Sequence, residues 1–176
     1  MHLLLIHQNF PGQFRDLAPA WLAAGHQITA LGSCSEAPAG TAWEGLRYLR
    51  YHFKDDDAPS AEQRGAAVAE ICRQLWTGDQ APDLVLVHTA GGEALGLKTI
   101  WPDRPLIAFP EVWGSPLDLG YGFDQSISGD WPDPELFLQK NSCSRQGIEA
   151  ESVSLVASSG QRCSFPPDLQ QHLQVL

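Results

Sequence analysis

Residues 2–15 read HLLLIHQNFPGQFR, which is a short apolar run, a polar turn and then a helical pattern. The run Leu3–Ile6 is too short to span a bilayer and does not alternate with polar residues, so it predicts a strand buried on both faces, as in a parallel sheet. Pro11 and Gly12 form the turn, and apolar residues then recur at helical spacing from Gln13 to Gly25. In open α/β folds, ligands bind beside such turns, at the carboxyl ends of the strands.

Strand and helix patterns alternate along the rest of the chain. This alternation predicts an α/β fold in a single domain, a doubly wound parallel sheet of the Rossmann-like three-layer type with the common strand order 3-2-1-4-5. Further strands are expected at 26–31, 46–52 (a sheet edge), 84–87, 106–109, 153–157 and 173–176, the last leaving the domain. Further helices are expected from a Ser60/Gln63 capping box to Gly78, at 93–101, at 135–151 and from Ser158.

Three details of the pattern carry their own expectations. Pro19 lies inside the first predicted helix and should kink it or lean it on the sheet. The run Asp55-Asp56-Asp57 lacks the spacing of a calcium loop, which favours a solvated acidic turn over a metal site. Residues 115–134 lose periodicity, and a loop of that length in a compact domain usually forms a lid or meets a partner.

Size and charge limit the classes of function. A chain of 176 residues is long enough for one domain with a real core. The formal charge of -10 argues against a nucleic-acid groove or an anionic membrane surface, since both usually need a basic face. Met1 is followed by only a short apolar run, so we expect a cytoplasmic protein without a secretory signal or a membrane helix. The four cysteines lack C-x-x-C spacing and are expected to be reduced.

Polar side chains end three of the predicted strands. In the order 3-2-1-4-5 the first and fourth strands are neighbours, and they end in His7 and His88, while Glu111 follows the fifth. Neighbouring strands lie about 4.8 Å apart, so these groups should flank one crevice, where imidazoles handle protons or hydroxyls and a carboxylate holds sugar hydroxyls. Each histidine, equally, can simply satisfy a loop carbonyl, and Glu111 can cap nearby backbone. Metal binding by the two histidines lacks a third ligand.

The glycine turns are the other candidate binding elements. Gly91 and Gly92 precede Glu93 at the expected start of a helix, where free amide groups suit a phosphate or a sugar hydroxyl. Neither this turn nor the turn at Pro11 and Gly12 matches G-x-G-x-x-G or a P-loop, which disfavours a dinucleotide or triphosphate site and a nicotinamide or flavin oxidoreductase. Ser158-Ser159-Gly160 is not a G-x-S-x-G nucleophile elbow.

Several motifs resemble, in order, the N-terminal domain of family-four glycosyltransferases of the GT-B fold. The opening motif is the most specific, and the resemblance covers nearly the whole chain. The motifs are His7-Gln8-Asn9-Phe10-Pro11-Gly12-Gln13-Phe14, Leu17-Ala18-Pro19, Gly25-His26, Pro82 to His88, Gly92-Glu93-Ala94-Leu95, Trp101-Pro102-Asp103 and Ser164-Phe165-Pro166.

The resemblance implies a retaining hexosyltransferase of carbohydrate biosynthesis with two Rossmann-like domains, of which residues 1–176 are the acceptor-side one and the C-terminal donor domain is not in this sequence. It implies a nucleotide-sugar donor, bound mainly by the missing domain, and a sugar or glycan acceptor, with no cofactor. His88 would lie near the reacting sugar, and Pro11, Gly12 and Gln13 would face donor phosphates or acceptor. Residues 89–91 read Thr-Ala-Gly, where relatives usually carry a proline or an aromatic residue.

From these observations we predict His88 as the catalytic residue. The predicted substrate-binding residues are His7, Pro11, Gly12, Gln13, Gly91, Gly92, Glu93 and Glu111. The isolated domain is expected to be inactive. The rival prediction is a freestanding, non-catalytic ligand-binding or interaction domain, and a homodimer stays open for either.

Overall fold

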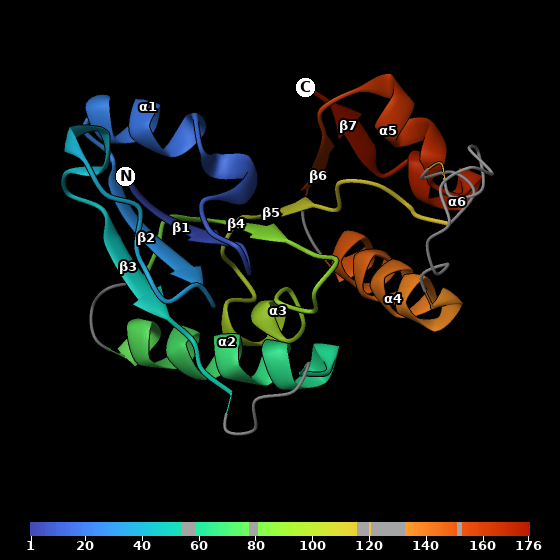
Figure 1. The fold of residues 1–176 in the computed structure, drawn as a ribbon, viewed down its shortest axis with the longest axis horizontal. Helices are drawn as coiled ribbons and strands as arrows, with labels where there is room; N and C mark the ends of the chain where they lie inside the picture. The colour runs from blue at the N-terminus through green and yellow to red at the C-terminus, as the bar shows by residue number, and fades with distance from the viewer. Residues whose placement is uncertain (54–58, 78–80, 116–119, 121–132, 151–152) are drawn as a thin grey trace, which may run out of the picture.

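The described residues of the computed structural model form one parallel sheet, with the order β3-β2-β1-β4-β5-β6-β7 (Figure 1). The structure describes residues 1–53, 59–77, 81–115, 120, 133–150 and 153–176. The predicted order 3-2-1-4-5 is confirmed, and two further strands extend it. The strands are β1 (His2–Ile6), β2 (Gln27–Gly32), β3 (Arg47–Arg50), β4 (Leu84–His88), β5 (Leu106–Phe109), β6 (Val153–Val156) and β7 (Leu173–Val175).

Helices cover both faces of the sheet, as the three-layer prediction requires (Figure 1). Leu3 and Leu5 of β1 pack with Phe14 and Ala18 on the side of α1, whereas Leu4 and Ile6 join the cluster on the side of α2 and α3. This alternation follows from the two-residue period of a strand. The helices are α1 (Leu17–Ala23), α2 (Ala61–Thr77), α3 (Leu97–Ile100), α4 (Pro134–Ala150), α5 (Ser159–Ser164) and α6 (Pro167–Gln170), with 3₁₀ turns η1 (Gly12–Phe14) and η2 (Thr41–Trp43).

The strand register sets the position of the site. β1 pairs with both β2 and β4, and Ile6 lies beside Val87. His7 directly follows β1, and His88 ends β4, opposite Phe109 of β5. The carboxyl ends of these three strands therefore meet at one edge of the sheet.

The predicted helix at 93–101 is wrong over its first half. Only Leu97–Ile100 is helical, because Gly92 (φ +99°) and Gly96 (φ +81°) adopt positive φ values that a right-handed helix does not allow. The expected helix N-terminus at Gly91 and Gly92 is therefore not formed there.

Two other element predictions are corrected. The first helix begins at Leu17, so Pro19 lies in its first turn, where a missing N–H costs no hydrogen bond and no kink is needed. Residues 173–175 do not leave the domain. They form the outermost strand, which pairs in parallel with β6.

Other local predictions are confirmed. The backbone N–H of Gln63 donates to the Ser60 hydroxyl and that of Ser60 donates to the Gln63 side chain, which is the reciprocal capping box. β3 is an edge strand and the four cysteines are free. Asp55-Asp56-Asp57 and most of 115–134 lie outside the described residues. Within the described chain, no helix combines the length and apolar character needed to cross a membrane.

Candidate functional site

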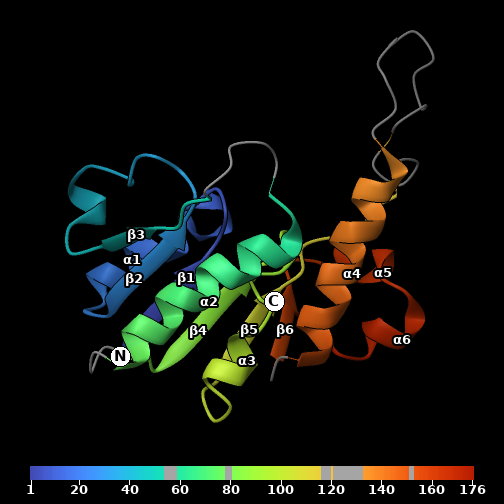
Figure 2. The ribbon, with the colours of Figure 1, turned by 90° about the horizontal axis from the view of Figure 1, so that it is seen from below.

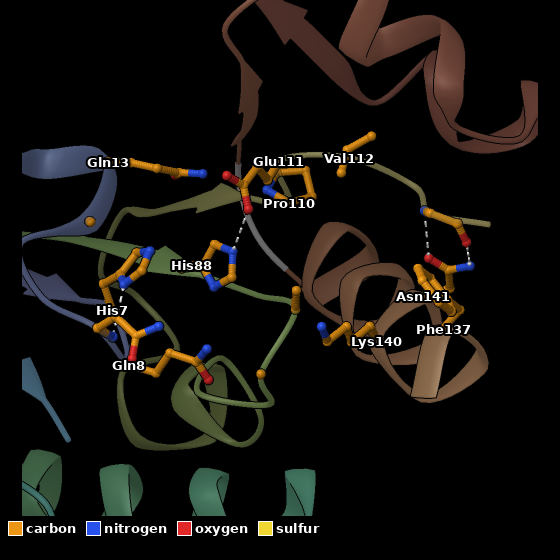
Figure 3. A pocket seen from close by; sticks show the side chains of 15 residues that line it. His7, Gln8, Gln13, His88, Pro110, Glu111, Val112, Phe137, Lys140 and Asn141 are labelled. Atoms are coloured by element: carbon orange, nitrogen blue, oxygen red, sulfur yellow. Dashed lines mark hydrogen bonds and ion pairs between the residues drawn. The ribbon is translucent and has the colours of Figure 1, made fainter. Parts of the chain in front are cut away.

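A cavity of about 610 Å³ opens at the carboxyl edge of the sheet (Figure 3). Its size lies in the usual range for small-molecule sites. One wall comes from the turns after β1 and β4, and the other comes from the segment after β5 together with α4 (Figure 3). Six of the nine residues predicted from the sequence line it, namely His7, Gly12, Gln13, Gly91, His88 and Glu111.

His7 is held in one tautomer by the turn that follows it. The backbone N–H of Asn9 donates to Nδ1 of His7 at 3.0 Å. Burial, reinforced by the neighbouring His88, lowers the pKa of His7 to about 4, while Glu111 opposes this shift. The ring is therefore neutral near pH 7, and because Nδ1 accepts, Nε2 carries the proton.

Gly12 allows the ring of His7 to take this position. A Cβ atom on Gly12 would lie 2.4 Å from Nε2 of His7, and Gly12 has a φ of +46°. Both the close approach and the backbone conformation favour glycine at this position. The Nε2–H of His7 therefore lies next to the backbone of Gly12, where no side chain covers it.

His88 is paired with Glu111 across the gap between β4 and β5. Nε2 of His88 lies 3.3 Å from Oε2 of Glu111, and the rings of His88 and His7 lie 4.7 Å apart between centroids. The hydrogen bond from His88 lowers the pKa of Glu111 to about 2, against the effect of burial and with help from the Gln13 side chain. The carboxylate is ionised and only accepts, so His88 donates through Nε2. In the described part of the chain, buried Nδ1 of His88 has no hydrogen-bond partner.

The backbone of Glu111 is strained. Glu111 has a φ of +63°, and among the described residues it alone, apart from glycines, has a positive φ. A left-handed conformation costs such a residue about 1 kcal/mol or more. Glu111 takes this conformation just after Pro110 and the end of β5, and Figure 3 shows its carboxylate directed at His88 and Gln13.

Three residues from the sequence prediction do not line the cavity. Glu93 is fully buried, where its Oε1 accepts a hydrogen bond from the hydroxyl of Tyr51 at 3.0 Å. Gly92 packs against the backbone of Ala61, and Pro11 lies in the turn before Gly12. The contacts of these three residues with a substrate stay predictions.

The wall formed by α4, which contributes Phe137, Lys140 and Asn141, was not predicted from the sequence. Gln8 and Asn9 were not predicted as lining residues either, although both belong to the opening motif. The signal in α4 was a polar residue, Asn141, at a buried helix register. Its side chain pairs with both backbone groups of Gly114, at 3.1 and 2.8 Å.

A parallel sheet of this order, with a polar cavity at its carboxyl edge, is the architecture of one domain of the GT-B glycosyltransferase fold. A family model described as "Glycosyl transferase family 4 group" matches residues 24–176. The chain therefore belongs to this glycosyltransferase family, as the motifs predicted. No curated protein matches the chain significantly.

Solved structures with the same fold are distant in sequence. Os79 from O. sativa in complex with UDP matches with a TM-score of 0.56 and 16% identity, over 90% of this chain and 46% of that one. A UDP-glucosyltransferase from Polygonum tinctorium capable of glucosylating indoxyl matches with a TM-score of 0.55 and 10% identity, over 99% and 52%. A UDP-N-acetylglucosamine 2-epimerase matches with a TM-score of 0.53 and 10% identity, over 99% and 47%. The chain thus spans about half the length of these structures.

Proposed function

We propose that residues 1–176 are the N-terminal, acceptor-side domain of a retaining hexosyltransferase that uses a nucleotide-sugar donor and an acceptor hydroxyl. The observation that carries this proposal is the convergence of His7, His88 and Glu111 on one cavity at the carboxyl edge of the sheet. Family membership supports it, and so does the UDP bound by a protein of the same fold. The other half of the site is supplied by a donor-binding domain.

The chemistry of the cavity suits such a transfer. The reaction breaks the bond between the anomeric carbon and the diphosphate, and it forms a bond between that carbon and the acceptor oxygen. The neutral Nε2–H of His7 is a donor to a substrate oxygen, next to the open backbone of Gly12. His88, oriented by Glu111, contacts the reacting sugar and aligns it with the acceptor.

The first experiment measures sugar transfer by the protein that the complete gene encodes. His88→Ala should lower the turnover rate by about 10²-fold or more and leave the melting temperature nearly unchanged, because the imidazole acts on the substrate. His52→Ala is the matched control, since His52 is exposed and lies outside the cavity. Normal turnover together with a large loss of stability would refute the catalytic role.

A second experiment separates the enzyme from a non-catalytic binding domain. Purified residues 1–176 should transfer no sugar, because the donor-binding domain is required. Turnover by this chain alone would contradict the proposal that sugar transfer requires a separate donor-binding domain. Downstream of Leu176, an E-x7-E pattern within a second Rossmann-like region supports the enzyme, and a stop codon supports the binding domain.

A further inference from the structure

The face of α4 that carries Lys140 packs closely on the turn after β4. Lys140, Ser144 and Gly147 are spaced four and three residues apart and so share one side of the helix. The Thr89 hydroxyl donates to that of Ser144 at 3.5 Å, and a Cβ on Gly147 would lie 2.6 Å from Cγ2 of Thr89. This close approach places the helix turn of Lys140 beside the cavity.

The same part of α4 is fixed on its other side. The Asn141 side chain accepts from the N–H of Gly114 and donates to its carbonyl, and both groups are buried. These two bonds join α4 to the segment that carries Glu111. The position of the α4 backbone that carries Lys140 is thus set relative to His88 and Glu111 by the contacts of its neighbours, and Figure 2 shows the long helix standing beside the sheet.

Among the described residues that line the cavity, Lys140 is the one lysine or arginine. Figure 3 shows its amino group directed from α4 toward the turn after β4. Within the described residues no hydrogen bond or ion pair is assigned to it. Although the chain has a formal charge of -10, this amino group lines the cavity and forms no ion pair with a described carboxylate.

The two ends of the cavity differ in charge. At one end, the Glu111 carboxylate is already hydrogen-bonded by His88 and Gln13, which limits its repulsion of an anion. At the other end, the cavity is lined by the ammonium group of Lys140 and by the ring of Phe137, three residues earlier on α4. An ammonium group binds phosphate as a point charge, and an aromatic ring packs against a sugar face.

We infer that Lys140, with Phe137 beside it, forms a subsite for a phosphate group of the sugar substrate bound in the cavity. The inference rests on the proposed function and adds the charge of the substrate. The anion belongs either to the acceptor or to the diphosphate of the donor, and the experiment distinguishes them.

The experiment titrates isotope-labelled residues 1–176 with glucose 6-phosphate, with glucose and with UDP, and follows the backbone amides of Ala90 and Gly114 by NMR. Lys140→Gln should weaken the binding of a phosphate-bearing ligand about tenfold, because one charge-assisted hydrogen bond is lost, and should leave glucose binding unchanged. Lys98→Gln removes the same charge from α3, outside the cavity, and should change nothing.

Each outcome has a stated meaning. Lys140 dependence for glucose 6-phosphate assigns the subsite to an anionic acceptor, and dependence for UDP alone assigns it to the donor diphosphate. The inference is wrong if neither phosphate-bearing ligand shifts these amides, if Lys140→Gln changes no affinity, or if Lys98→Gln weakens binding equally. Sugar transfer that is insensitive to Lys140→Gln overturns the subsite but leaves the proposed function standing. If binding depends on Lys140 but the complete gene product transfers no sugar, the subsite stands and the proposed function is wrong.

Discussion

The neutral imidazole of His7 gives the protein a specific dependence on pH. Its pKa falls from 6.5 to about 4 on folding, so between these values the unfolded chain binds a proton that the folded chain does not. Stability therefore falls as the pH is lowered through this window, by about 2 kcal/mol at pH 5. His7→Asn should reduce this loss in urea unfolding at pH 7 and pH 5. The same substitution at exposed His52 should not.

The pair of Glu111 and His88 predicts a tautomer. While Glu111 accepts from Nε2, neutral His88 should be protonated at Nε2, which ¹⁵N chemical shifts of the ring report. Glu111→Ala should abolish this preference, whereas Glu36→Ala, at an exposed position, should preserve it. An unchanged ring spectrum in Glu111→Ala would show that another group sets the tautomer.

Because the pKa of Glu111 is lowered, its contribution to stability is complete above about pH 4.5 and is lost as the pH falls toward 2.

Among the turns, Gly12 and Gly25 form a matched pair for substitution. Both have positive φ values, but a Cβ on Gly12 would overlap the ring of His7, whereas nothing lies within 4 Å of one on Gly25. Gly25→Ala should cost about 1 kcal/mol of stability through the backbone alone. Gly12→Ala should cost more and should also shift the His7 ring resonances. Equal stability losses with unchanged His7 resonances would mean that the turn adjusts without moving the ring.

At the helix α4, Asn141 supplies the link to the segment after β5. Asn141→Ala removes two buried hydrogen bonds and leaves the N–H of Gly114 without its acceptor, which should cost about 2 kcal/mol in chemical unfolding. Ser142→Ala, on the exposed side of α4, should cost less than about 0.5 kcal/mol. If the two variants were equally stable, α4 would be held mainly by its apolar contacts.

Across the whole molecule, stability should be graded from the centre of the sheet outward. β1 and β4 have paired strands on both sides and apolar packing on both faces, whereas β3 and β7 end the sheet. Hydrogen exchange followed by mass spectrometry should therefore be slowest in residues 2–6 and 84–88 and fastest in the two outer strands. Protection of β7 equal to that of β1 would indicate a further contact along its edge.

The fold was predictable wherever a local pattern agreed with the global packing. The apolar runs of β1 and β4 placed His7 and His88 correctly at one edge, and the Ser60/Gln63 capping box marked the start of α2. The helix at 93–101 was not predictable from its apolar spacing, because that spacing does not reveal the positive φ values of Gly92 and Gly96 or the packing of Gly92 on the backbone of Ala61, the first residue of α2. The α4 wall was missed because its one local signal, Asn141 at a buried helix position, does not reveal which distant turns the helix faces.

The long separation of β1 from one of its neighbours bears on how the protein is made. His2 and Asp83, 81 positions apart, are joined by a hydrogen bond at the start of the two strands. During synthesis we expect β1 to emerge first and to pair with β2, while its other edge stays unpaired until β4 has been translated. During that interval an apolar strand with an unpaired side is available to chaperones or to other nascent chains.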